Sequence, residues 1–161
     1  MKLHYLFSRN KKIGSKLISW SSKLFKSHVT NLKEIPSHVA ILVNEMFVIE
    51  STLTTGVRIV PYSKWKQINE ELYKIEYTTK GECIKCLLFE VWGKKYDWLG
   101  IIYFSYCMFK HLVFHSSLPN KNLWERENYF FCTEFAARLG GHNYSMTTPA
   151  KMCNDLLENV K

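Results

Sequence analysis

The sequence predicts an α+β fold in which an antiparallel sheet packs against helices. Short β-rich runs separated by turn residues fill the stretch from about residue 38 to residue 78. Apolar residues recur at helical spacing before this stretch and again after it. The turns are too short for crossover helices, so neighbouring strands are expected to run antiparallel. A length of 161 residues suits one domain, and we assign residues 1–161 to it.

The N-terminal part predicts a strand and then a basic amphipathic helix. Residues 3–7 are apolar enough for a short strand. Residues 13–26 place apolar side chains on one helical face and lysines on the others. The polar stretch that follows ends at Pro36 and predicts a loop.

The middle of the chain predicts a meander of strands. Two β-rich runs flank the turn residues Asn44 and Glu45 and predict a hairpin. A second turn, a further strand, a short helix that carries Trp65 and an alternating strand follow. The expected ranges are 38–43, 46–51, 57–61, 63–69 and 72–78.

The C-terminal half predicts helices. Residues 98–109 are apolar but too few for a membrane span, which needs about 20 apolar residues, so we expect a buried helix there, with an interfacial or membrane role as the alternative. Thr148 and Pro149 are a helix cap and a first helical residue, and they start a final helix to about residue 159. The other expected helices are 80–92 and 131–139.

The net charge of +8 belongs to the beginning of the chain. Residues 1–35 hold eight Lys or Arg and one Glu, a balance of +7, while the rest is close to neutral. Lys16, Lys23 and Lys26 flank the apolar face of the predicted helix, a pattern typical of contact with an anionic surface. A solvated face of a core helix gives the same pattern. No sequence motif for reading nucleic acid is present.

The five cysteines predict a reducing compartment, because their odd number and the absence of a recognisable signal peptide do not favour a disulfide framework. We therefore expect a cytoplasmic protein, with peripheral membrane contact as an option. Cys83 and Cys86 form a Cys-x-x-Cys pair. Because a structural zinc site usually needs two such pairs, we predict core packing for them and no metal or cofactor.

Cys132 is the strongest candidate for chemistry. It stands at the start of the helix predicted for residues 131–139. A helix N-terminus stabilises a thiolate and offers backbone N–H groups that can hold an oxyanion. The alternative is a buried structural cysteine.

A nucleophilic thiol needs a base, and His38 at the start of the hairpin can supply it. A two-residue turn at Asn44 and Glu45 would place His38 opposite Ser51. A three-residue loop centred on Asn44 would place it opposite Glu50, so that the carboxylate could hold one ring nitrogen. The sequence leaves this register open. His28 competes for the role if the hairpin is shifted, but no strand-like string follows it.

Taken together, several strings resemble the circularly permuted NlpC-type papain-like superfamily, with the YiiX-like hydrolases as the nearest branch and the lecithin retinol acyltransferases as more distant members. The resemblance covers about residues 8–155. The order and spacing of the strings carry it. They are Ser37-His38-Val39-Ala40-Ile41, Val48-Ile49-Glu50-Ser51, Gly56-Val57, Gly93-Lys94-Lys95-Tyr96-Asp97, Phe131-Cys132-Thr133-Glu134 and Thr148-Pro149.

The resemblance implies a permuted papain-like fold and acyl transfer through a thioester. Cys132 would be the nucleophile, His38 the general base and Glu50 the residue that orients His38. Tyr96 would line the site and help to hold the oxyanion, or else be a core aromatic residue with a bonded hydroxyl. The implied substrate is a small-molecule, peptide or lipid-like amide or acyl ester. Water as acceptor makes a peptidase or amidase, and an amine or alcohol makes an acyltransferase.

Two other classes of protein fit the same sequence. One is a binding or structural protein that keeps this fold without turnover. The other is a basic protein that docks on an anionic membrane or on nucleic acid and carries its thiols incidentally. Reactivity of Cys132 that depends on His38 would separate the enzyme from both.

Overall fold

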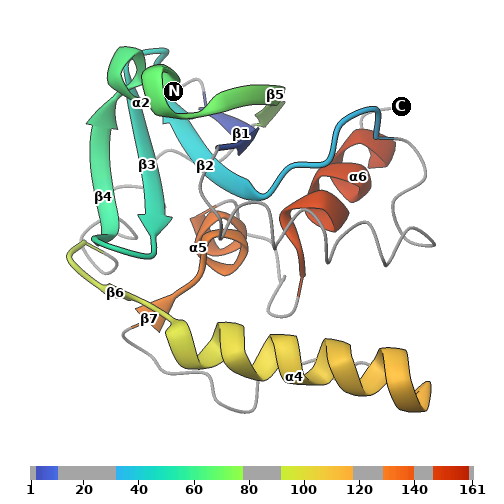
Figure 1. Cartoon of the computed structure of the whole chain (residues 1–161). Helices are drawn as coiled ribbons and strands as arrows, with labels where there is room; N and C mark the ends of the chain where they lie inside the picture. Colours follow the sequence, from blue (N-terminus) through green and yellow to red (C-terminus); the bar gives the residue numbers. More distant parts are fainter. Residues whose placement is uncertain (1–2, 11–31, 78–91, 118–128, 140–146, 160–161) are drawn as a thin grey trace.

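The computed structural model describes residues 3–10, 32–77, 92–117, 129–139 and 147–159. These residues form a five-stranded antiparallel sheet, a small two-stranded sheet and helices, which confirms the α+β prediction. Figure 1 shows the strands at the upper left, with helix α5 beneath them and the long helix α4 along the bottom.

Every strand expected between residues 3 and 78 is present. The sheet order is β4-β3-β2-β1-β5, and each neighbouring pair is antiparallel. Placing β1 between β2 and β5 makes this N-terminal strand central, and its side chains are correspondingly buried. The strands are β1 (Leu3–Arg9), β2 (His38–Val43), β3 (Phe47–Thr52), β4 (Gly56–Pro61) and β5 (Glu70–Tyr77).

The described helices also match the predicted ones closely. The hydroxyl of Thr148 accepts a hydrogen bond from the backbone N–H of Lys151 at 3.2 Å, which confirms Thr148 as a helix cap. The two-residue strands β6 (Lys95–Tyr96) and β7 (Tyr129–Phe130) pair in parallel and were not predicted. The helices are α2 (Tyr62–Ile68), α4 (Trp98–Phe114), α5 (Cys132–Leu139) and α6 (Pro149–Asn159).

Both faces of the five-stranded sheet are covered. One face packs against α5 and α6, and this larger core joins Tyr5, Phe7 and Ile41 to Phe135 and Met152. On the opposite face the indole ring of Trp65, from α2, packs against a smaller cluster of aliphatic side chains from β1, β2 and β3. Because β2 contributes side chains to both covered faces in turn, its sequence is apolar after its first residue.

The β2–β3 hairpin corrects both predicted registers. The structure pairs Val43 with Phe47 and Ile41 with Ile49. Continued along the strands, this register sets His38 level with Thr52, rather than with Ser51 or Glu50. The turn contains Met46 as well as Asn44 and Glu45. The carbonyl oxygen of Met46 accepts from the backbone N–H of Tyr62 at 2.9 Å, which continues the pairing of β3 with β4.

Two residues of this turn adopt the left-handed backbone conformation. Asn44 and Glu45 have φ values of 49° and 58°, and the N–H of Met46 donates to the carbonyl of Val43 at 3.1 Å. Two consecutive residues of positive φ give a turn whose twist matches that of the strands. The shift from the nearest predicted register is one residue.

The prediction of a buried helix at residues 98–109 was wrong on burial. Helix α4 extends to Phe114, and several of its large apolar side chains are exposed, among them Ile102, Phe109 and Phe114. The sequence is apolar around most of the helix, so its pattern could not show which side is covered.

Some predictions lie outside the described residues. They are the basic helix of residues 13–26 with Lys16, Lys23 and Lys26, the competing His28, and all but the last residue of the helix of residues 80–92 with Cys83 and Cys86. Residue 92 itself lies in a turn.

None of the helices in the described part of the chain combines the length and the hydrophobicity that crossing a bilayer requires.

Candidate active site

Three predicted residues meet although they come from three different elements. His38 is the first residue of β2, Glu50 lies within β3, and Cys132 is the first residue of α5. The Nε2 atom of His38 lies 2.8 Å from Oε2 of Glu50. The thiol of Cys132 also lies close enough to His38 to raise the pKa of its imidazole. Because Glu50 holds Nε2, the nitrogen left for the thiol is Nδ1.

The pleat of the sheet explains how His38 reaches Glu50 without being its direct cross-strand partner. In the observed register Glu50 is level with Ala40, two residues along from His38. Residues two apart point to the same face of a sheet, and such diagonal neighbours lie within reach of long side chains. His38 and Glu50 therefore lie on the same face of the sheet, as the prediction required, although they are not direct partners.

Glu50 is buried and accepts hydrogen bonds from three side chains. Besides His38, the indole Nε1 of Trp65 donates to Oε2 at 3.0 Å. The Nε and Nη2 atoms of Arg58 donate to Oε1 at 2.9 Å and 2.6 Å. A carboxylate that is only 1% exposed needs such partners, since an unpaired buried charge is costly.

These contacts set the charges of the pair. Burial by itself opposes ionisation of both groups. For His38, hydrogen bonds to Cys132 and Glu50 and the attraction of their charges outweigh burial and raise the pKa to about 10. For Glu50, the contacts with His38 and Arg58 outweigh burial and lower the pKa to about 2. At neutral pH the site therefore holds an imidazolium on a carboxylate.

Cys132 is held at its position by hydrogen bonds to the residues before it. The hydroxyl of Ser51 donates to the carbonyl of Phe130 at 2.7 Å, and the N–H of Asp97 donates to the same oxygen at 3.3 Å. The first helical bond runs from the N–H of Phe135 to the carbonyl of Phe131 at 3.0 Å. Because α5 packs on β2 and β3, its N-terminus lies against His38.

Tyr96, the fourth predicted site residue, lies beside this N-terminus. It pairs with Phe130 across β6 and β7, and it is 6% exposed. Burial, followed by the charges of Cys132 and Asp97, holds its pKa well above the ordinary range. Its hydroxyl therefore keeps its proton and can act as a hydrogen-bond donor. Asp97 is also buried, and its Oδ1 accepts from the N–H of Gly100 at 3.1 Å at the start of α4.

A backbone clip joins the segment carrying Tyr96 to the main sheet. The N–H of Val57 donates to the carbonyl of Lys94 at 2.9 Å. Gly56 has a φ of +66°, and a Cβ atom there would lie 2.2 Å from the oxygen of Lys94. Only glycine allows this approach, so the Gly56-Val57 string of the sequence has a structural role next to the site.

Sequence reasoning missed Arg58 and Trp65 as partners of Glu50. Arg58 had a signal, because it lies directly opposite Glu50 across β3 and β4, and oppositely charged residues that flank a short turn favour such pairing. No sequence signal pointed to Trp65, since its contact with Glu50 depends on how α2 packs on the sheet.

We also compared the chain with known proteins. No protein-family model, no curated protein and no solved structure matches it.

Proposed function

We propose that this chain is a thiol hydrolase or acyltransferase of the permuted papain-like type, acting through a Cys132 thioester. The observation that carries the proposal is the Cys132–His38–Glu50 arrangement, in which a buried carboxylate holds Nε2 of His38 while the thiol of Cys132 lies beside the same ring and helps to raise its pKa. A nucleophile beside a base that a third group orients is the arrangement expected for covalent catalysis.

In the proposed reaction the sulfur of Cys132 attacks a substrate carbonyl carbon and a C–S bond forms. The C–N or C–O bond to the leaving group breaks, and the leaving group takes the proton held by His38. Water then adds to the thioester carbon while His38 accepts one of its protons, and the C–S bond breaks to release the acid and the sulfur of Cys132. The proton gained by His38 replaces the one given to the leaving group, so the Cys132–His38 pair is restored. An amine or alcohol in place of water gives acyl transfer.

The oxyanion would lie between the N-terminus of α5 and the hydroxyl of Tyr96. Backbone N–H groups at the start of a helix lack intrahelical partners and carry partial positive charge. The protonated Tyr96 hydroxyl supplies a further donor. Donors of this kind stabilise charge that develops in the transition state.

Thiol alkylation tests the proposal without knowledge of the substrate. We expect iodoacetamide to label Cys132 faster than a free thiol at neutral pH, and His38→Ala to slow that labelling at least about 10-fold. Peptide mass mapping reads each cysteine separately, and buried Cys153 provides an internal comparison because burial raises its pKa to about 12. Labelling of Cys132 at the rate of a free thiol, unchanged in His38→Ala, would exclude the enzyme and favour a binding protein with this fold.

An acyl substrate tests the covalent step. Incubation with p-nitrophenyl acetate should acetylate Cys132, with the adduct detected by mass mapping and removed by hydroxylamine. Cys132→Ser should lose this adduct, whereas Cys107→Ser should keep it. Acetylation distributed over several residues, with none enriched at Cys132, would count against an acyl-enzyme.

A further inference from the structure

Helix α4 carries an apolar stripe that no described element covers. The stripe consists of six residues that are each between 43% and 60% exposed. At 3.6 residues per turn their spacing places them within an arc of about 100° on one face of the helix. They are Trp98, Leu99, Ile102, Tyr106, Phe109 and Val113.

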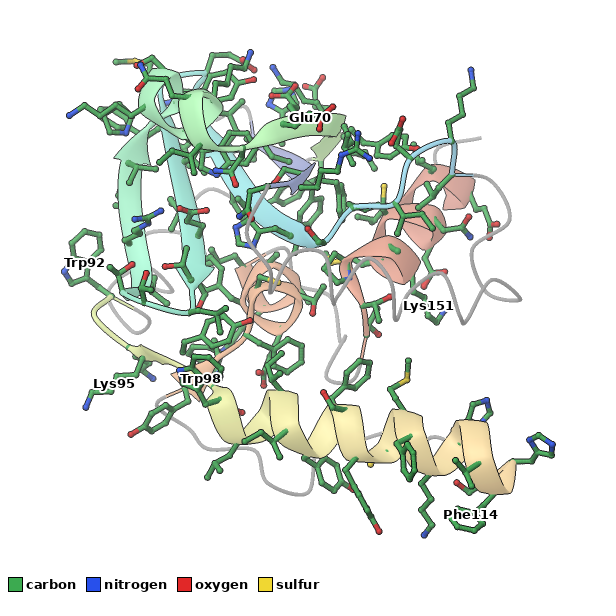
Figure 2. The ribbon with its side chains drawn as sticks, in the orientation of Figure 1. Glu70, Trp92, Lys95, Trp98, Phe114 and Lys151 are labelled. Carbon is green, nitrogen blue, oxygen red and sulfur yellow. The ribbon has the colours of Figure 1, made fainter. Side chains whose placement is uncertain are left out.

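The opposite side of α4 faces inward. Tyr103, Cys107 and Met108 are each 7% exposed, and Gly100 is buried as well. The helix is therefore attached along one side and presents the apolar stripe on the other. In Figure 2 it lies along the bottom of the molecule, with Trp98 at the end next to β6 and Phe114 at the far end.

The charges around the stripe have one sign. Lys95 precedes the helix and Lys110 flanks the stripe, and both side chains are exposed. Within residues 92–117 the single acidic side chain is Asp97, which is buried and caps the helix. Trp92, three residues before Lys95 in the sequence, is also exposed.

We propose that the apolar stripe of α4 docks on an anionic lipid bilayer. Trp, Tyr and Phe side chains next to lysines are the composition of helices that lie in the bilayer interface, where aromatic rings enter the headgroup region and lysines meet lipid phosphates. Each lysine near an anionic surface adds about a factor of five in affinity. Because the inner side of α4 is buried in the protein, the helix lies along the bilayer.

The charge pattern favours a bilayer over a second copy of the chain. A two-fold contact would place this same patch against itself, bringing Lys95 and Lys110 against equal charges with no exposed acid among residues 92–117 to balance them. An anionic surface satisfies both the lysines and the apolar side chains. This inference goes beyond the proposed function and does not depend on the chemistry of Cys132.

Vesicle co-sedimentation tests the proposal. We expect the full chain to bind vesicles of phosphatidylcholine mixed with phosphatidylglycerol, and to bind pure phosphatidylcholine far less. Ile102→Glu and Phe109→Glu should each lower the partition coefficient at least about 10-fold. Lys95→Glu combined with Lys110→Glu should lower it at least about 30-fold, and added salt should weaken binding of the unaltered chain.

Matched controls keep the test decisive. Ile68→Glu changes a side chain that is 57% exposed on α2 and should leave binding unchanged. Circular dichroism and Cys132 alkylation in solution show that each variant is folded, so a failure of docking is distinct from a failure of the proposed function. Loss of binding in Lys16→Glu, Lys23→Glu, Lys26→Glu but not in the α4 variants would assign the contact to the N-terminal segment and overturn the proposal. A dimer in light scattering that Ile102→Glu dissociates, without vesicle binding, would overturn it too.

Discussion

Arg58 lies directly opposite Glu50 across strands β3 and β4, and its guanidinium donates two hydrogen bonds to Oε1 of the carboxylate. Because Arg58 occupies one oxygen, the other remains for Nε2 of His38 and Nε1 of Trp65. The carboxylate that orients His38 is thus itself held by Arg58 and by Trp65. Arg58 and Trp65 act on the proposed chemistry through Glu50 and are positioning residues.

Replacing Arg58 should weaken this support. Arg58→Met removes two charged hydrogen bonds, and we expect the free energy of unfolding to fall by about 1–3 kcal/mol. The pKa of Glu50 should rise, because Arg58 helps to lower it. In a plot of the Cys132 alkylation rate against pH, the fall on the acid side (the acid limb) should therefore move to higher pH. Arg9→Met is the control, since the ion pairs of Arg9 with Glu34 and Glu70 are exposed and should contribute less than about 1 kcal/mol. An unchanged acid limb would contradict a positioning role for Arg58.

Trp65→Phe tests the indole hydrogen bond separately from packing. The ring at this position is buried, and phenylalanine keeps an aromatic side chain but no N–H. We expect a loss of about 1–3 kcal/mol in urea unfolding and slower alkylation of Cys132. Trp92→Phe, at a position that is 58% exposed, should leave both measurements almost unchanged in solution. Equal effects of the two substitutions would show that the Glu50 contact is not what matters.

The His38–Glu50 pair predicts how stability depends on pH. Folding raises the pKa of His38 from 6.5 to about 10, so its stabilisation is complete below pH 6.5 and is lost as the pH rises toward 10. Folding lowers the pKa of Glu50 from 4.5 to about 2, so its stabilisation is present above pH 4.5 and is lost as the pH falls toward 2. Urea unfolding should therefore give the highest stability between about pH 4.5 and 6.5.

His38→Gln checks the assignment of the alkaline change. Glutamine has no ionisable group, so stability above pH 6.5 should become much flatter, while Glu50 still produces an acid slope through Arg58. The same alkaline slope in His38→Gln as in the unaltered chain would show that another group causes it.

Gly56→Ala should disturb the clip beside the site. Its new Cβ would lie 2.2 Å from the carbonyl oxygen of Lys94, and the positive φ adds strain. We expect a loss of about 2–4 kcal/mol and slower Cys132 alkylation, because the segment leading to Tyr96 has to move. Gly93→Ala is the matched control: it also has a positive φ, but nothing lies within 4 Å of the added atom. It should cost about 1 kcal/mol through strain alone. Equal losses in both variants would rule out the clip as the cause.

Local patterns were enough to predict most elements from the sequence. The hairpin runs, the Thr148 cap and the helix that starts at Cys132 all depend on neighbouring residues, and the structure has each of them. The sequence also singled out Cys132, His38, Glu50 and Tyr96, which come from four separate elements of the fold. Their chemical roles remain predictions that the alkylation and acylation experiments test.

Tertiary structure alone decided the hairpin register, the contact of Trp65 with Glu50 and the environment of α4. In the observed register Met46 belongs to the turn, and the N–H of Tyr62, sixteen positions later, donates to its carbonyl oxygen. Trp65 reaches Glu50 because α2 folds onto that face of the sheet. The apolar sequence of α4 is equally consistent with burial and with exposure, and packing on one side left the stripe from Trp98 to Val113 open. Each of these results depends on contacts between residues distant in sequence, which local periodicity does not encode.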